Sequence, residues 1–313
     1  MGKIAFVFAG QGAQAVGMGQ DLYNISSSAK KVFDMSGTVR DLCFAGPKEK
    51  LDITVNTQPA VFLTGLACAA VLSEKGIQAD GVAGFSLGEI PAACYAGMLS
   101  REQAFNLVCH RAKTMHECAE RTKGSMFAVL KLPAEKVDKI CSTLDMVYPV
   151  NYNSPGQTVV ACSENTAEIL QQAVIDHGGR AIKLDVSGAF HSPFMDAASE
   201  SVAAYLEKES IGTAQIPIYS NVTAREYTDA NKTSGDLPNL NLKNLLAKQI
   251  NHPVLWQKLI ENMISDGFET FIEAGPGRTL SGLIKKINPD VHTHNVSDVP
   301  SLEKTEKECS LNA

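Results

Sequence analysis

The chain has 313 residues, of which 44% are hydrophobic, 20% charged and 6% aromatic. This composition is typical of globular enzymes and excludes disordered, fibrous and membrane-embedded classes. The formal net charge of −6 provides no overall positive field for nucleic acid or for an anionic membrane, so neither is expected as a partner.

The first 122 residues predict strands and helices of a parallel α/β fold. Residues 4–9 are a short apolar run bounded by Gly10, which is typical of a strand buried on both faces. The other predicted elements are a buried helix over 59–72, a strand over 81–85 and a helix from Ser100, with a capping box to Gln103, to about Cys118.

Residues 123–187 predict a different order of strands and helices. They predict, in order, a strand over 126–130, a helix over 133–144, strands over 146–151 and 158–162, a helix over 165–177 and a strand over 181–186. An Asn-Ser-Pro-Gly turn over 153–156 joins the two middle strands as a hairpin. This βαββαβ order is that of a small ferredoxin-like unit.

Strand and helix alternation resumes after residue 187. Strands are predicted over 216–219 and 270–273, with helices over 240–250 and 254–264. The expected fold is therefore a large α/β domain with a parallel sheet, residues 1–122 and 188–300, interrupted by the small subdomain over 123–187. Residues 301–313 are polar and charge-rich, and a flexible tail is expected there.

The eight cysteines are scattered, with no C-x-x-C pair and no Cys/His cluster. This spacing argues against zinc and against a disulfide framework, and it favours free thiols in a reducing cytoplasm. The apolar run at the N-terminus is too short for a signal segment, and no stretch approaches the roughly 18 apolar residues of a membrane span. A cytoplasmic protein is therefore expected.

A serine nucleophile is suggested by Gly84-Phe85-Ser86-Leu87-Gly88, which matches G-x-S-x-G between a predicted strand and a helix. The two glycines permit a sharp turn that exposes the Ser86 hydroxyl. Backbone N–H groups near Leu87 would then face an oxyanion at the start of the helix. The alternative is an ordinary strand-to-helix turn, because the motif also arises by chance.

His191 is the candidate base, because it follows a predicted strand and precedes a helix whose first turn suits Pro193. A common loop histidine is the alternative. The turn over 10–15 matches a relaxed dinucleotide fingerprint, but the second strand with its acidic end is missing. This turn either brings the N–H of Gln11 to the oxyanion or is merely a tight turn after the first strand.

Arg111 falls inside the apolar stripe of the helix that starts at Ser100. A guanidinium on this inward face needs an anion. The partner is either an Asp or Glu of the protein, in a structural ion pair, or the carboxylate of a substrate, which suits the two-pronged geometry of arginine.

Together these residues resemble the malonyl-CoA:acyl carrier protein transacylases of fatty acid synthesis and the related acyltransferases of polyketide synthases. The matching segments span about residues 3 to 297 in the family's order. They are Gly10 to Gln14, Gly84 to Glu89, Arg111, Asn153 to Gln157, Gly188 to His191, Gln249 with Pro253-Val254, and Glu273 to Gly277.

The resemblance implies a hydrolase-like α/β domain with a ferredoxin-like subdomain, and a cofactor-free transfer of malonyl from coenzyme A to the phosphopantetheine thiol of an acyl carrier protein. The implied roles are Ser86 as nucleophile, His191 as base, a backbone carbonyl near Gln249 orienting the imidazole, Gln11 and Leu87 as oxyanion donors, Arg111 as ligand of the malonyl carboxylate, and Phe85, Phe190 and Asn153 as residues that shape the substrate site.

The chain departs from many relatives at Phe85, where they have histidine, so a polar contact near the malonyl group is missing or replaced. Phe190 resembles malonyl-selective members, because its ring fills the space that an α-methyl branch needs. The carrier is expected to be acidic, and the candidate docking residues are Arg180, Lys183, Lys285 and Lys286, with solvated surface charge as the alternative for each. A monomer is expected.

Three other functions compete with this interpretation. A discrete acyltransferase of a polyketide synthase would use the same site. A serine esterase or thioesterase would need Ser, then Asp or Glu, then His in chain order, with His292 or His294 as the base. A non-catalytic carrier-binding module would have no use for both Ser86 and His191.

Overall fold

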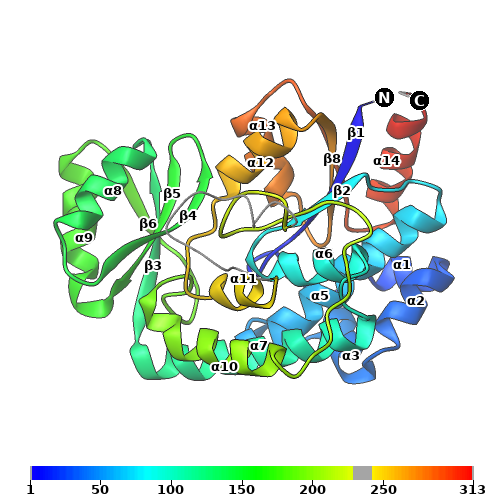
Figure 1. The fold of residues 1–313 in the computed structure, drawn as a ribbon, viewed down its shortest axis with the longest axis horizontal. Helices are drawn as coiled ribbons and strands as arrows, with labels where there is room; N and C mark the ends of the chain where they lie inside the picture. The colour runs from blue at the N-terminus through cyan, green and yellow to red at the C-terminus, as the bar shows by residue number, and fades with distance from the viewer. Residues whose placement is uncertain (1, 228–241, 312–313) are drawn as a thin grey trace.

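The computed structural model describes residues 2–227 and 242–311. These residues form a five-stranded sheet and a separate four-stranded sheet, each with its own helices (Figure 1). The predicted α/β fold with a second, smaller sheet is confirmed.

The larger sheet is parallel. Its strands lie in the order β7 (Ile218–Tyr219), β2 (Gly81–Gly84), β1 (Lys3–Phe8), β8 (Phe268–Ala274) and β9 (His292–Val296). Phe6 and Phe8 of β1 pack into one hydrophobic core, whereas Ala5 and Val7 pack into another. Successive side chains of a strand point to opposite faces, so β1 is buried on both sides, as its continuous apolar run predicts.

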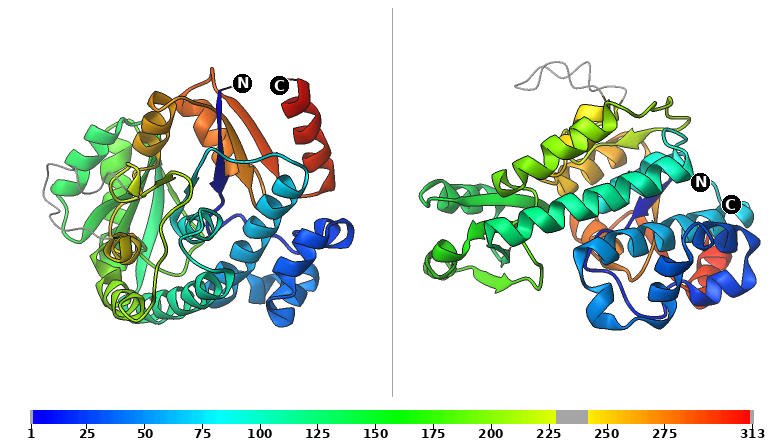
Figure 2. Two further views of the ribbon diagram at one scale, coloured as in Figure 1. Left: turned by 45° about the vertical axis from the view of Figure 1, so that its right-hand side comes forward. Right: turned by 90° about the horizontal axis from the view of Figure 1, so that it is seen from below.

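Helices cover both faces of this sheet (Figures 1 and 2). One core is built with α5 (Thr54–Glu74), α6 (Glu89–Tyr95), α7 (Arg101–Thr122), α10 (Asp196–Leu206) and α11 (Leu242–Lys248). The other core is built with α12 (Trp256–Ser265) and α13 (Thr279–Ile287). The capping box predicted at Ser100 is present, with Ser100 and Gln103 bonding each other's backbone.

One expectation about apolar stretches is wrong. Within the described part of the chain, α5 is long and apolar enough to cross a membrane, with a mean hydropathy of 1.5 over its most apolar window. This window is 83% buried inside the protein, where α5 packs against α2, α7 and β8. The same composition suits a core helix, because such a helix is apolar all round.

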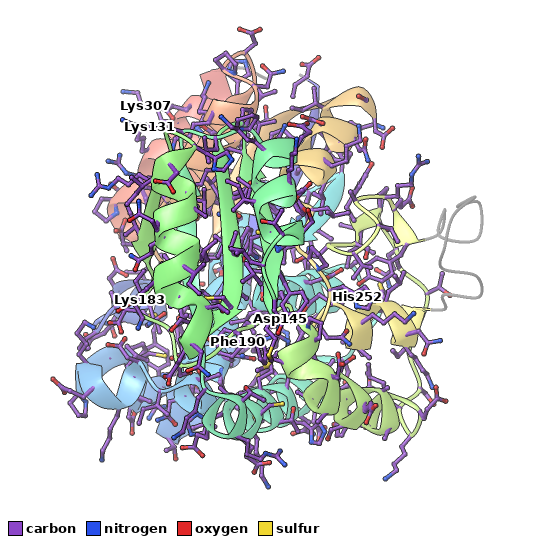
Figure 3. The ribbon with its side chains drawn as sticks, turned by 90° about the vertical axis from the view of Figure 1, so that its left-hand side faces the viewer. Lys131, Asp145, Lys183, Phe190, His252 and Lys307 are labelled. Carbon is purple, nitrogen blue, oxygen red and sulfur yellow. The ribbon has the colours of Figure 1, made fainter. Side chains whose placement is uncertain are left out.

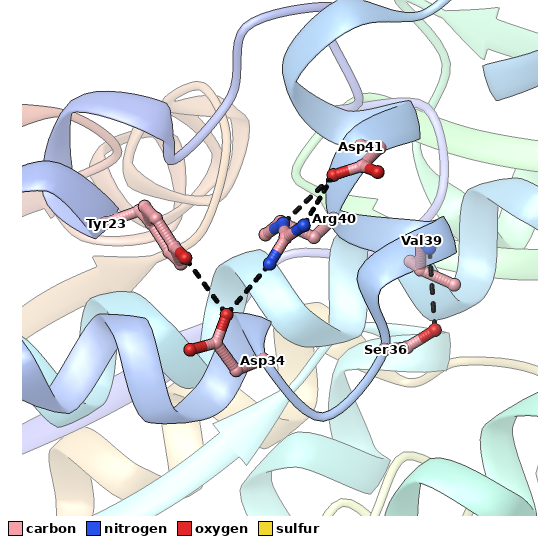
Figure 4. Close-up of polar contacts among 6 residues, drawn as sticks. All are labelled: Tyr23, Asp34, Ser36, Val39, Arg40 and Asp41. Atoms are coloured by element: carbon pink, nitrogen blue, oxygen red, sulfur yellow. Dashed lines mark hydrogen bonds and ion pairs between the residues drawn. The ribbon is translucent and has the colours of Figure 1, made fainter.

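A group of short helices before α5 was not predicted. They are α1 (Gln20–Ile25), α2 (Ser27–Phe33), α3 (Gly37–Ala45) and α4 (Lys48–Leu51). Arg40 of α3 bridges Asp34 and Asp41, and Asp34 also accepts from the Tyr23 hydroxyl at 3.0 Å (Figure 4). Ser36 caps α3 by accepting from the Val39 N–H at 3.4 Å. These polar contacts link α1, α2 and α3 to one another, and α2 packs against the apolar α5.

The smaller sheet is antiparallel and has the strand order β4-β5-β3-β6. Its elements are β3 (Gly124–Leu130), α8 (Ala134–Ser142), β4 (Val147–Ser154), β5 (Gln157–Ser163), α9 (Ala167–Asp176) and β6 (Arg180–Lys183). Figure 3 looks onto its two helices, with Lys131 and Lys183 toward opposite ends of the sheet. The predicted βαββαβ order is confirmed, and β6 ends three residues earlier than the predicted 186.

The two sheets are joined through α7 and α10, which pack side by side (Figure 2). The helix α7 runs to Thr122 and ends at Lys123, whose left-handed conformation (φ 46°) turns the chain into β3. After β6 the chain returns through a loop over 184–192, which contains His191, and then through the 3-10 turn Pro193–Met195 into α10. The domain boundaries at 122/123 and 187/188 remain predictions.

The flexible tail predicted from residue 301 is wrong. Val299–Leu311 forms a further helix, α14, in which Leu302 and Thr305 are buried. Glu306 pairs with Lys75, which follows the last residue of α5, at 3.2 Å, and Glu308 pairs with His294 of β9 at 2.9 Å. Charged residues that suggested a solvated tail therefore contact the larger domain, and the helix buries Leu302 and Thr305.

Candidate active site

Ser86 lies at a sharp turn between β2 and α6, in the short 3-10 helix Ser86–Gly88. Its φ of 54° is left-handed, a strained conformation for a side chain other than glycine. A Cβ on Gly84 would lie 1.9 Å from the Gly88 carbonyl carbon, and one on Gly88 would lie 2.1 Å from the Phe8 oxygen. The turn therefore requires both glycines of the motif.

His191 meets Ser86 directly, with Nε2 at 2.7 Å from the serine Oγ. Its other ring nitrogen, Nδ1, lies 2.7 Å from the backbone oxygen of Gln249. A carbonyl only accepts, so Nδ1 carries the proton and Nε2 is left to accept from the Ser86 hydroxyl. Burial, together with the charge of Arg111, lowers the pKa of His191 to about 4, so the ring is neutral at physiological pH.

Arg111 reaches the same hydroxyl from α7. Its guanidinium donates to Ser86 Oγ at 3.2 Å, to Gln249 Oε1 at 2.8 Å and to Gln58 Oε1 at 2.7 Å, and only 2% of the residue is exposed. It forms no ion pair with any described residue. Burial lowers its pKa to about 10, which still leaves a cation at neutral pH. The Arg111 guanidinium, with its fork of N–H donors, is thus hydrogen-bonded only to neutral oxygens. A carboxylate can displace them, because it accepts hydrogen bonds from a cation more strongly.

A fully buried carboxylate, Glu89, lies behind this group. Its Oε2 accepts from Gln249 Nε2 at 2.8 Å, and its Oε1 accepts from the Tyr227 hydroxyl at 2.5 Å and the Asn221 N–H at 3.1 Å. Burial raises the pKa of Glu89 to about 7, although these hydrogen bonds oppose the rise. Asn221 in turn accepts from the Ser86 N–H at 2.7 Å.

A cavity of about 420 Å³ opens onto Ser86 between the two sheets. The predicted site residues that line it are Gln11, Phe85, Ser86, Arg111, Asn153, Phe190 and His191. Leu87 is buried beside Ser86, and Gln249 joins the site through its bonds to Arg111 and to the Ser86 carbonyl. The structure thus brings together residues that are up to 238 positions apart in the chain.

The contacts of three cavity residues bear on the roles predicted for them. The side chain of Gln11 donates to Thr54 Oγ1 at 3.2 Å and accepts from Gln58 Nε2 at 3.4 Å. Asn153 is buried, and its Oδ1 has no hydrogen-bond partner among the residues described. Phe85 packs edge-on against Trp256, with ring centroids 5.4 Å apart. Phe85 therefore makes an aromatic contact at the position where a histidine would offer a polar one.

The residues that an esterase would need are not brought together. His292 and His294 lie on β9, which is separated from β2 by two strands, or about 14 Å across the sheet. His294 is paired with Glu308. Among the described residues, no group of three or more His, Cys, Asp or Glu side chains is placed to hold a metal ion.

The docking candidates differ in their surroundings. Arg180 and Lys183 are exposed on β6 of the small sheet. Lys285 donates to the carbonyls of Pro289 and Val291, at 2.9 and 2.6 Å, so its ammonium closes the end of α13. Lys286 reaches Gln157, a residue of the cavity lining, at 3.5 Å. Lys286 therefore contacts a residue that lines the cavity, and Lys183 directly precedes two others, Leu184 and Asp185.

Three contributors were missed from the sequence: Gln58, Glu89 and Asn221. Gln58 is a buried amide inside the apolar α5, and Glu89 is a buried acid at the start of α6. A polar residue on an inward helical face is the signal that singled out Arg111, and it applies equally to Gln58. Asn221 follows β7 in a loop and has no comparable signal.

Comparison with known proteins places the chain in a family. The model of the acyl transferase domain matches residues 5–309. The malonyl CoA-acyl carrier protein transacylase of Bacillus subtilis (strain 168) is 37% identical over 313 residues, with 97% of this chain and 96% of that protein covered.

Solved structures agree with this relationship. The malonyl CoA-acyl carrier protein transacylase of Clostridium perfringens superposes with a TM-score of 0.92 at 38% identity, covering 98% of this chain and 97% of that one. A malonyl-transacylase solved in complex with a type II PKS acyl-carrier protein has a TM-score of 0.90 at 32% identity, covering 98% and 99%. The chain therefore belongs to the acyl transferase domain family and, within it, to the malonyl CoA-acyl carrier protein transacylases.

Proposed function

We propose that the chain transfers the malonyl group from malonyl-CoA to the phosphopantetheine thiol of a holo-acyl carrier protein through an ester on Ser86. One observation carries this proposal. Ser86 Oγ lies 2.7 Å from a neutral imidazole and 3.2 Å from a buried guanidinium that has no carboxylate partner among the described residues. A base and a cation at one hydroxyl suit an acyl group that bears a free carboxylate.

The first half-reaction loads the serine. The malonyl carboxylate displaces a glutamine oxygen from Arg111, and the Ser86 Oγ attacks the thioester carbonyl carbon while His191 Nε2 takes its proton. The oxyanion accepts from the backbone N–H groups of Gln11 and Leu87, each such donor contributing about 3 kcal/mol. The C–S bond then breaks, and His191 returns the proton to the departing CoA sulfur.

The second half-reaction unloads the serine in the reverse manner. The carrier thiol gives its proton to His191 and attacks the ester carbonyl through the same oxyanion. The bond to Ser86 Oγ breaks, the serine regains its proton from His191, and the malonyl group leaves as a thioester of the carrier. Transfer exceeds hydrolysis if water is kept from the ester, a task suited to apolar lining residues such as Met115, Met126 and Phe190.

The scheme assigns every proton transfer and charge contact to the chain's own side chains and backbone, so no cofactor is included. Phe85, Phe190 and Asn153 are proposed to shape the acyl end of the cavity. Asn153 has an unpartnered buried oxygen, among the residues described, that a substrate donor could satisfy.

The carrier is proposed to belong to fatty acid synthesis, as the family resemblance implies. A polyketide carrier is the alternative, and it is favoured by one structural neighbour whose partner is a type II PKS acyl-carrier protein. Action in the cytoplasm and a monomeric state are further parts of the proposal.

The proposal is tested by intact-mass spectrometry after treatment with malonyl-CoA. The parent protein should gain one malonyl group, which holo-carrier protein removes, and Ser86→Ala should gain none. Ser187→Ala is the matched control, because Ser187 Oγ contacts Thr54 at 3.1 Å near the site but has no part in the scheme. An adduct that persists in Ser86→Ala would overturn the assignment, and release of free malonate as fast as transfer would favour a hydrolase.

A further inference from the structure

Glu89 is a buried carboxylate that takes no part in the reaction scheme, yet it contacts the residues that hold the reacting groups. We propose that Glu89 is a positioning residue that sets the orientation of the Gln249 amide and thereby keeps the Arg111 fork aimed at the substrate carboxylate. This inference rests on the proposed function, because it assigns Arg111 to that carboxylate.

The orientation of the Gln249 amide is fixed at three points. Its Nε2 donates to Glu89 Oε2 at 2.8 Å and to the Ser86 carbonyl at 2.6 Å, while its Oε1 accepts from Arg111 Nη2 at 2.8 Å. A flipped amide would direct an NH2 group at the guanidinium and an oxygen at two acceptors. The ionised form of Glu89, which prevails above its pKa of about 7, only accepts and therefore selects the orientation in which Gln249 offers Arg111 an oxygen.

The amide also separates two opposite charges. Glu89 and Arg111 are both buried, and a direct two-pronged ion pair between them would occupy the fork that the substrate needs. With Gln249 between them, the guanidinium keeps only neutral acceptors, from Gln249, Gln58 and Ser86. A substrate carboxylate can replace a neutral acceptor more readily than a charged one.

A second route leads from Glu89 to the nucleophile. Glu89 Oε1 accepts from the Asn221 N–H at 3.1 Å, and the Asn221 side chain bonds the Ser86 N–H at 2.7 Å and the Gly84 carbonyl at 2.6 Å. This route acts on both malonyl and acetyl transfer, as does the bond from the Gln249 amide to the Ser86 carbonyl. The contact between Gln249 and Arg111 is different, because only malonyl has a carboxylate for Arg111 to bind. The ratio of malonyl to acetyl acylation therefore reports on that contact.

The test compares Ser86 acylation by malonyl-CoA and by acetyl-CoA in Glu89→Gln, with the melting temperature measured beside it. The new amide has one acceptor for three donors, so the Gln249 orientation is no longer enforced. The ratio of malonyl to acetyl kcat/KM should fall about tenfold, in the range for loss of a hydrogen bond to a charged group.

The direction of the change separates positioning from simple electrostatics. Removing a negative charge near Arg111 would by itself strengthen its attraction for malonyl and raise the ratio. A raised or unchanged ratio in Glu89→Gln would therefore overturn the proposal. Glu89→Asp keeps the charge but is one methylene too short to reach Gln249, so its ratio should fall as well, and it serves as the test if Glu89→Gln does not fold.

Tyr227→Phe is the matched control. It removes a donor from the same carboxylate, at 2.5 Å, but leaves the bond to Gln249 in place. A purely structural role for Glu89 predicts that both variants lower malonyl and acetyl acylation together, in proportion to their loss of melting temperature. The positioning role predicts a parental ratio in Tyr227→Phe and a reduced ratio in Glu89→Gln.

Failure of this inference differs from failure of the proposed function. If Arg111→Ala leaves the malonyl to acetyl ratio unchanged, the carboxylate role of Arg111 is wrong and the Glu89 proposal falls with it. If Arg111→Ala lowers the ratio but Glu89→Gln does not, only the Glu89 proposal is overturned.

Discussion

Arg111 Nη2 lies 3.2 Å from Ser86 Oγ, so the buried cation and the nucleophile are in direct contact. His191 contacts the same oxygen at 2.7 Å. In malonyl-CoA a single methylene separates the free carboxylate from the thioester carbonyl. A carboxylate held on Arg111 would therefore bring that carbonyl close to Ser86, which links substrate choice to positioning for attack.

Arg111→Ala should lower kcat/KM for malonyl-CoA far more than for acetyl-CoA. Loss of one partner of a buried charge pair costs about 2–5 kcal/mol, or roughly 30- to several-thousand-fold. Acetyl-CoA makes no such pair and should lose little. The measurement is the ratio of the two rates in a variant whose melting temperature is also known.

Arg111→Lys is the matched control, since it keeps the charge and loses the fork. It should recover only part of the malonyl activity. Equal losses with both substrates, accompanied by a lower melting temperature, would instead identify Arg111 as a structural residue.

The pH dependence of acylation should show an unusually acidic base. Burial and the charge of Arg111 lower the pKa of His191 to about 4, and the base is lost as the ring takes a proton. The effect of this group on Ser86 acylation by malonyl-CoA should thus be flat above about pH 5.5 and appear as a fall when the pH approaches 4. Stopped-flow acylation over this range gives the midpoint.

The Arg111→Ala variant sharpens this prediction. Without the neighbouring cation the pKa of His191 should rise, and the midpoint should move to higher pH. A midpoint near 6.5, the ordinary value for histidine, in the parent protein would contradict the buried environment of the ring.

Gly84→Ala should abolish acylation and lower the melting temperature. Its Cβ would lie 1.9 Å from the Gly88 backbone, so the turn that presents Ser86 cannot keep its shape. Gly282→Ala is the control, because Gly282 lies inside α13 and its Cβ would meet nothing within 4 Å. This second change should stabilise the protein by about 0.5–1 kcal/mol and leave acylation unaltered. Calorimetry and intact-mass spectrometry measure the two effects.

Phe190→Ser should admit methylmalonyl-CoA. Phe190 lines the cavity next to His191 and is only 6% exposed, so we expect its ring to occupy space that an α-methyl branch would need. The gain in the methylmalonyl to malonyl ratio of kcat/KM is limited to roughly 10–200-fold, which is what a pocket can distinguish for one methyl group. If the ratio in Phe190→Ser equals that of the parent protein, another residue that lines the cavity excludes the methyl branch. Phe85 is then the next residue to test.

Lys286→Glu should raise the KM for the carrier without slowing acylation by malonyl-CoA. Lys286 lies beside Gln157 at the cavity, where an acidic carrier would be attracted. Lys285→Glu should act differently and lower the melting temperature, because Lys285 closes the end of α13. Lys304→Glu on α14 is the surface control. Carrier kinetics equal to those of the Lys304 variant would count against this docking surface.

The sequence predicts the fold where local pattern decides it. Three predicted features reflect interactions within a few residues, and each is present. They are the apolar run of β1, the capping box at Ser100 and the turn that joins β4 to β5. The positions of Ser86 and His191 follow from a motif and a loop at strand ends. Their 2.7 Å contact joins residues 105 positions apart, so the family resemblance was needed to pair them.

The rest of the fold and of the site depends on contacts between residues far apart in the sequence, which no local pattern predicts. Glu89 is defined by donors from Asn221, Tyr227 and Gln249, which are 132 to 160 positions away. The four helices before α5 are short, and only the caps at Ser26 and Ser36 signal their starts. The periodicity of so short a helix is too weak to separate it from a loop.

The helix α14 has a consequence for the edge of the larger sheet. Thr305 of α14 donates to the backbone oxygen of Asn295 at 3.2 Å, and Asn295 lies on β9, one of the two edge strands of the sheet. An uncovered edge strand offers its amides and carbonyls to strands of other molecules. The charge-rich composition of the last residues suggests that they could be removed. A shortened protein that lacks 299–311 would, however, leave the β9 edge uncovered and prone to aggregation.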